Sequence, residues 1–153
     1  MRRAFIPLLV FCSMLLGRSA LASSGEVIKV LPHFLDAKGK HTLSPSLYDR
    51  DAYQAMLRKN PEKRSGIRYD VNWRARGTDG EVKLRIELRG IAQGNQPRTK
   101  TIDAVVKPGR GTSRWDGVAL TGEGFKSFGE VTAWRVTLWE GDKQLGEQKS
   151  FLW

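Results

Sequence analysis

The chain has 153 residues, a formal net charge of +10 and 40% hydrophobic residues. This length is typical of one domain and excludes a multidomain machine. Because apolar residues are distributed along the whole chain, the composition predicts a packed core and excludes a disordered protein.

The first 22 residues have the features of an export signal. Two arginines near the start precede an apolar run over 4–17, and Ala20 and Ala22 occupy the small-residue positions of a cleavage site. The apolar run, about 14 residues long, is shorter than the ~20 that a membrane-spanning helix needs. We therefore expect a cleavable signal peptide over 1–22 and a single exported domain over 23–153, periplasmic or extracellular. An uncleaved membrane anchor is the alternative.

Removal of this segment changes the chemistry of the remaining chain. It takes away three arginines and no acid, which leaves 23 basic and 16 acidic residues and a net charge of +7. Cys12, the only cysteine, lies in the apolar run. The mature chain therefore has no thiol, which excludes disulfides, thiolate catalysis and cysteine metal sites.

Alternation of apolar and polar residues with a period of two is the clearest pattern after the signal. It is typical of strands that have one face on a core and the other in water. The pattern is strongest over 67–75, which contains Trp73, and over 82–88. In all, the sequence predicts seven strands, over 27–31, 67–75, 82–88, 99–107, 113–120, 131–140 and 145–153. In the last of these, Phe151 and Trp153 would be fixed in the sheet, and Gly146 marks a possible bulge.

One helix is expected over 46–59, between the first two strands. Ser44 or Ser46 can cap it, and an Asn-Pro step ends it. Its apolar face, which includes Leu57, would pack on a sheet, and its opposite face, which includes Gln54, would be solvated.

Seven short strands with this helix predict an all-β, two-layer antiparallel β-sandwich with the helix inserted between strands one and two. Part of this pattern resembles fibronectin type III and other immunoglobulin-like domains. Their second and third strands are similar to the alternating strand that carries Trp73 and to the next alternating strand, with a loop between them. Their penultimate strand is similar to 131–141. The resemblance covers about 67–153 and implies a fold but no activity. The chain departs from the pattern because it lacks a cysteine pair and inserts a helix.

The sequence around Asp79-Gly80 also permits a second arrangement. A two-residue turn there would join the flanking strands in one hairpin and set Trp73 opposite Ile86. In a sandwich of immunoglobulin type these two strands belong to opposite sheets. Two glycines in the loop over 76–81 favour the sandwich, and a meander or a small barrel is the alternative.

Basic residues occupy outward positions of the same two strands. The candidate anion-binding face consists of Arg68, Arg74, Lys83, Arg85 and Arg89. Basic charge usually indicates nucleic acid, but for an exported protein we expect an anionic polysaccharide, a lipid head group or an acidic protein. The alternative is a solvated basic face that protects a sheet. A second basic segment, over 107–114, would form either an anion-binding nest or a flexible turn.

Trp139 is the candidate stacking residue. It is out of phase with the apolar positions of its strand, so it would lie on the outer face, where a tryptophan can stack on a sugar ring; the alternative is that the helix or a loop covers it. The other four tryptophans, at 73, 115, 134 and 153, are expected in positions that a core accepts.

No constellation of catalytic residues is evident. His33 and His41 have Asp36 between them, but a metal site there would need further ligands from elsewhere, and no nucleophile-elbow sequence occurs. We therefore expect no enzyme, no cofactor and no metal site. The expected function is a non-enzymatic binding or structural module that attaches to an anionic partner; a carbohydrate-binding module or an accessory domain of an envelope complex is the alternative.

Overall fold

The computed structural model describes residues 22–153, so all but the last residue of the expected signal peptide lies outside the described part. The elements of the described part, in chain order, are β1 (Ser24–Asp36), α1 (Leu47–Lys59), the 3-10 turn η1 (Pro61–Lys63), β2 (Arg64–Arg76), β3 (Val82–Ala92), β4 (Gln96–Val106), β5 (Arg114–Thr121), α2 (Gly122–Phe128), β6 (Glu130–Glu140) and β7 (Lys143–Lys149).

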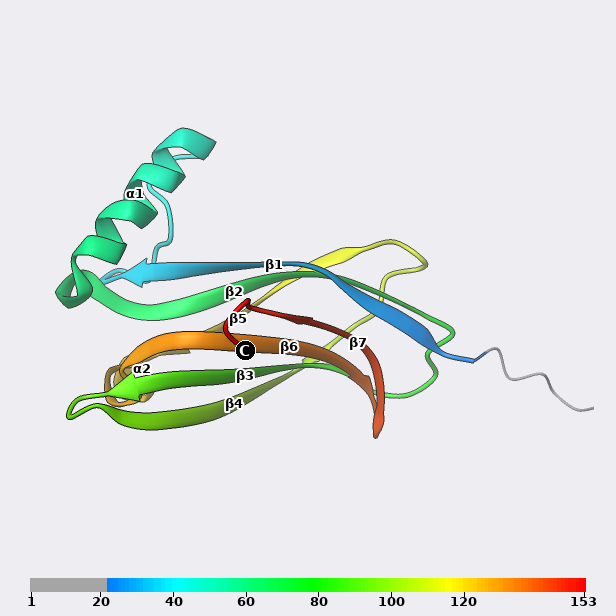
Figure 1. Ribbon diagram of the computed structural model, residues 1–153. Coiled ribbons are helices and arrows are strands. Elements are labelled where there is room, and N and C mark those ends of the chain that lie inside the picture. Colours follow the sequence, from blue (N-terminus) through cyan, green and yellow to red (C-terminus); the bar gives the residue numbers. More distant parts are fainter. Residues whose placement is uncertain (1–21) are drawn as a thin grey trace, which may run out of the picture.

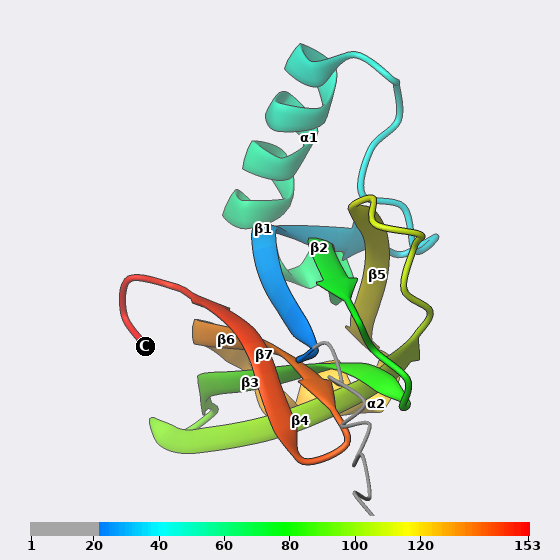
Figure 2. The same ribbon diagram turned by 90° about the vertical axis from the view of Figure 1, so that its right-hand side faces the viewer.

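The strands form two antiparallel sheets that face each other in two layers (Figure 1). The three-stranded sheet has the order β1-β2-β5, and the four-stranded sheet has the order β4-β3-β6-β7. Since β2 and β3 lie in different sheets, the hairpin across Asp79-Gly80 does not form. The expected all-β, sandwich-like architecture is confirmed at this level. Helix α1 stands over one end of the outer face of the three-stranded sheet (Figures 1 and 2).

The core lies between the sheets and is built from the alternating positions of β2 and β3. Its members from these strands are Ile67, Tyr69, Val71, Trp73, Ala75, Val82, Leu84, Ile86 and Leu88. Trp73 is fully buried, and its indole N–H donates a hydrogen bond to Asp116 on β5 at 2.7 Å. The charged residues between these positions face outward, as the period of two predicts.

Helix α1 begins as the sequence predicts. The Ser46 side chain caps it by accepting a hydrogen bond from the Asp49 N–H. Leu57, on the apolar face of this helix, is fully buried, as predicted. The helix lies beside β1, which is an edge strand of its sheet.

The prediction that Gln54 faces solvent is wrong. Gln54 is only 4% exposed. Its amide oxygen accepts from the Phe34 N–H at 2.8 Å, and its amide nitrogen donates to the carbonyls of Phe34 at 2.9 Å and His41 at 2.8 Å. Because β1 has no neighbouring strand on this side, the Gln54 side chain supplies the hydrogen-bond partners that the backbone of β1 would otherwise lack.

A second helix, α2, occurs between the expected strands over 113–120 and 131–140, where the sequence predicted no helix. It brings Phe128 into the core, and Phe125 packs against that core. Glycines at 122 and 124 weaken helix propensity, which is why the sequence carried little helical signal. The helix ends at Gly129, whose φ of 87° is in the left-handed region.

The chain end differs from the expected strand. β7 stops at Lys149, and Phe151 is fully exposed. Trp153 lies instead near two guanidinium groups of the four-stranded sheet. The guanidinium carbon of Arg89 is 4.1 Å from the centre of its ring, and that of Arg135 is 4.9 Å from it. Cation–π attraction therefore holds this residue in place of strand pairing. The expected irregularity near Gly146 is confirmed as a register shift between β6 and β7.

Candidate functional site

The five basic residues of the candidate anion-binding face do not share one face. Arg68 and Arg74 lie on β2, and Lys83, Arg85 and Arg89 lie on β3. Because β2 and β3 belong to different sheets, their outward side chains point to opposite sides of the molecule. Whether any of the five binds an anion stays a prediction, but a single contact surface made of all five would require the hairpin.

The two residues of the candidate face that lie on the three-stranded sheet are paired with acids. The Arg68 Nε lies 2.7 Å from the Asp70 carboxylate, and its guanidinium lies against the backbone of Gly117. Arg74 forms an ion pair with Glu26 of β1. Their charges are therefore neutralised locally.

On the four-stranded sheet, Arg85 binds Asp103 through two hydrogen bonds of 2.8 and 2.9 Å. This contact lowers the pKa of Asp103 and raises that of Arg85. Lys83 lies 3.9 Å from the same carboxylate, and Arg89 is engaged by Trp153. This face therefore carries a network of paired charges.

Trp139 lies on the outer face of the four-stranded sheet, level with Lys83. It is half-buried. Its indole N–H donates to the Thr137 hydroxyl at 2.7 Å, and the Arg85 guanidinium carbon lies 5.6 Å from its ring centre. These contacts engage the groups of Trp139 that a sugar would use, and its stacking role stays a prediction.

Trp115 is the tryptophan that the structure exposes most clearly, and its expected place in the core is wrong. It is 52% exposed and lies on β5 opposite Asn72 of β2. The signal for this was present in the sequence, because Trp115 is out of phase with Val118 and Leu120, the buried residues of its strand.

The basic loop over 107–113 lies beside the end of β2. Together they enclose an open hollow of about 630 Å³, which Arg76 and Thr78 line from one side and residues 108–111 from the other. Gly111 has a φ of 78°, and its N–H donates to the Gly109 carbonyl at 2.7 Å. These glycines produce a tight turn that presents Arg110 at the rim.

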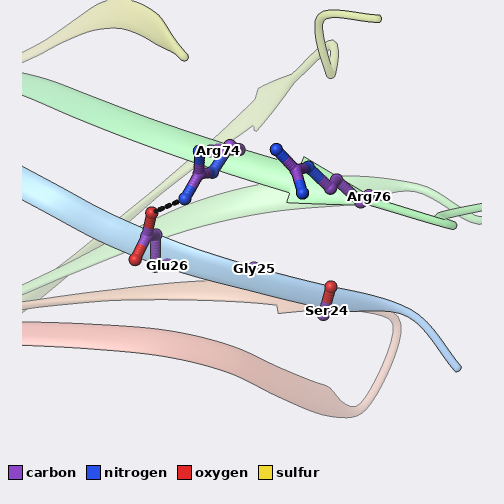
Figure 3. A pocket seen from close by; sticks show the side chains of 5 residues that line it. All are labelled: Ser24, Gly25, Glu26, Arg74 and Arg76. Carbon is purple, nitrogen blue, oxygen red and sulfur yellow. Dashed lines mark hydrogen bonds and ion pairs between the residues drawn. The ribbon is translucent and has the colours of Figure 1, made fainter. Parts of the chain in front are cut away.

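A second, smaller hollow of about 220 Å³ lies on the outer face of the three-stranded sheet. It is lined by Ser24, Gly25, Glu26, Arg74 and Arg76 (Figure 3). The Arg76 guanidinium extends along the strand toward Arg74, which holds Glu26 (Figure 3). Arg76 thus borders both hollows.

We call Arg76, Lys107, Arg110 and Arg114 the basic end. All four are exposed. Within residues 22–153, none of them forms an ion pair, whereas Arg68, Arg74 and Arg85 all do. The basic end is therefore a cluster of basic side chains that lacks acidic partners in the described part of the chain.

The two histidines lie close together, and the His41 carbonyl accepts a hydrogen bond from Gln54 of α1. His33 is buried on β1, and its ring stacks on that of His41 with 5.2 Å between ring centres. Burial lowers the pKa of His33 below 6.5, its ordinary value; His41, Arg50 and Arg68 add to this effect, and Asp70 opposes it. No group of three or more potential metal ligands occurs among residues 22–153.

The lowered pKa of His33 predicts a pH dependence of stability. Below pH 6.5 the unfolded chain takes up a proton at this residue before the folded chain does, so the free energy of unfolding falls as pH falls from 6.5 toward the folded-state pKa. Urea unfolding of the protein and of His33→Gln at pH 7.5 and at about 5 measures this contribution. The loss on acidification should be smaller in the variant, and an equal loss in both would contradict the assignment.

Comparisons with known proteins found no matching family model, no similar curated protein and no similar solved structure. By its fold, the described part of the chain is an antiparallel two-sheet β protein with paired charges on its outer faces. Among the described residues, no helix is long and apolar enough to cross a bilayer.

Proposed function

We propose that the chain is an exported, non-enzymatic binding module that attaches to an anionic partner through the basic end. One observation supports this most strongly: Arg76 and Arg110 border one open hollow, and within residues 22–153 neither has an acidic partner. The five residues of the candidate anion-binding face, in contrast, are already engaged by acids or by an aromatic ring.

The chemistry of the basic end favours an oxyanion. A guanidinium presents a planar fork of N–H donors that matches carboxylate, sulfate and phosphate groups. Arg76 and Arg110 are exposed, so anion binding there does not require burial of an unpaired charge. The net charge of +7 expected for residues 23–153 would also attract a polyanion over a distance.

We also propose that the domain is immunoglobulin-like. In the constant-type immunoglobulin arrangement, strands one, two, five and four form one sheet and strands three, six and seven form the other. The order here differs in one respect, because β4 pairs with β3. The buried Trp73 adds support. This is an argument about fold alone, since such sandwiches have many functions. The proposal that the protein is exported is supported by the signal-peptide features of residues 1–22.

The test uses the double variant Arg76→Gln/Arg110→Gln. Its matched control, Lys83→Gln/Arg89→Gln, removes the same charge from the opposite sheet. We expect binding to at least one of three probes at low salt: polygalacturonate, polyglutamate or phosphatidylglycerol vesicles. Affinity should fall about tenfold in the first variant, little in the control, and steeply with added salt. Affinity unchanged by the first variant, or insensitive to salt, would refute the proposal.

A further inference from the structure

We infer that the anionic partner is an acidic polysaccharide and that one of its sugar rings stacks on Trp115. This rests on the proposed function and adds the class of ligand. It is carried by the juxtaposition of an exposed tryptophan, a polar hollow and Arg76 of the basic end on the outer face of the three-stranded sheet.

The strand register places these groups on the same face. Trp115 is paired with Asn72, Glu26 with Arg74, and Ser24 with Arg76. Asn72, Arg74 and Arg76 are alternate residues of β2, so their side chains point the same way. Helix α1 covers the opposite end of this face, and no other described helix or strand lies over the rest of it (Figures 1 and 2).

The spacing fits an extended ligand. Asn72 and Arg76 are four residues apart on one strand, or about 13 Å at ~3.3 Å per residue. Trp115 lies one strand to the side of Asn72, and Glu26 lies one strand to the other side of Arg74. A short oligosaccharide could therefore contact the ring and the hollow at once, whereas a single small anion could not.

The hollow contains groups of both signs. Arg74 and Arg76 can donate hydrogen bonds to a carboxylate or a hydroxyl, and Glu26 can accept from hydroxyls. An acidic peptide side chain has no hydroxyl to donate to Glu26. The head group of phosphatidylglycerol has hydroxyls but no ring that could stack on Trp115. An acidic sugar supplies both carboxylates and hydroxyls, and its apolar ring face suits an aromatic surface.

The surroundings of Trp115 leave room for a ring. Trp115 is 52% exposed, so part of its ring is open to a ligand. The next outward position of β5 is Gly117, which has no side chain, and the Arg68 guanidinium lies within 2.5 Å of where its Cβ would be. Trp139 differs, since its N–H is bonded and Arg85 lies over its ring.

The test is calorimetric titration with polygalacturonate, with polyglutamate as an anionic polymer without sugar rings and phosphatidylglycerol vesicles as a lipid arm. Trp115→Ala should weaken polygalacturonate binding about tenfold and leave polyglutamate binding unchanged. Trp115→Tyr, which keeps an aromatic ring, should restore most of the affinity. Tyr48→Ala is the matched control, because Tyr48 is also an exposed aromatic residue but lies on α1.

The outcomes separate this inference from the proposed function. If Trp115→Ala leaves polygalacturonate affinity unchanged while Arg76→Gln/Arg110→Gln lowers it, the sugar-stacking inference is wrong and anion binding stands. Binding to vesicles or polyglutamate but not to polygalacturonate would also overturn the inference. If no probe binds at low salt, both proposals fail. Circular dichroism of each variant establishes that it is folded.

Discussion

Replacement of Trp73 by alanine is expected to lower the free energy of unfolding by about 3–5 kcal/mol. Trp73 is fully buried at the centre of the core, between the two sheets. Removal of its ring forfeits apolar burial and leaves a cavity, and it also removes the N–H that Asp116 accepts. Urea denaturation followed by circular dichroism measures the change.

Two further variants separate the ring from the hydrogen bond. Trp73→Phe keeps most of the apolar surface but loses the N–H, so its cost should be smaller, about 1–3 kcal/mol. Asp116→Asn keeps an acceptor and should cost less than Asp116→Val. A Trp73→Ala protein as stable as the parent would show that the ring does not lie between the sheets.

Replacement of Gly129 by alanine should also be severe, with a loss of about 2–6 kcal/mol when backbone strain and overpacking, each about 1–3 kcal/mol, are combined. Gly129 has a φ of 87° and a ψ of −149°, a conformation that nearly excludes residues other than glycine. A Cβ there would lie 2.3 Å from the Ile91 carbonyl oxygen and 2.7 Å from the Ala92 Cα. Neither backbone atom can move without disturbing the end of β3.

Gly94 provides the matched control. Its φ of 77° is also positive, but a Cβ there would have no neighbour within 4 Å. It begins the tight turn between β3 and β4 with Asn95, whose φ is 57°. Gly94→Ala should therefore cost only the left-handed strain, about 1–2 kcal/mol. Equal losses in the two variants would contradict the close contact at Gly129.

The strands and helix α1 could be predicted because each has a local signal. Period-two alternation sorts the side chains of β2 and β3 onto a core face and a water face, and Ser46 marks the start of the helix. Gln54 and Trp153 could not be placed in this way. Gln54 is buried because it hydrogen-bonds to the backbone of an edge strand that is distant in sequence. Trp153 lies outside the strands and is held by arginines of β3 and β6.

The site was harder to predict, because alternation says which residues share a strand face but not which strands share a sheet. The five-residue face combined outward positions of β2 and β3, and the assignment of these strands to opposite sheets separates them. The basic end involves a loop and the end of β2, which only the fold brings together. Trp115 could have been found, since its phase relative to Val118 was visible in the sequence.

The most direct test of the account is a ¹⁵N–¹H NMR titration of the folded protein with polygalacturonate. We expect the shift changes to concentrate at residues 74–76 and 107–115, with the Trp115 indole N–H among the most affected. Changes centred instead on Lys83, Arg85 and Arg89, on the opposite sheet, would contradict it.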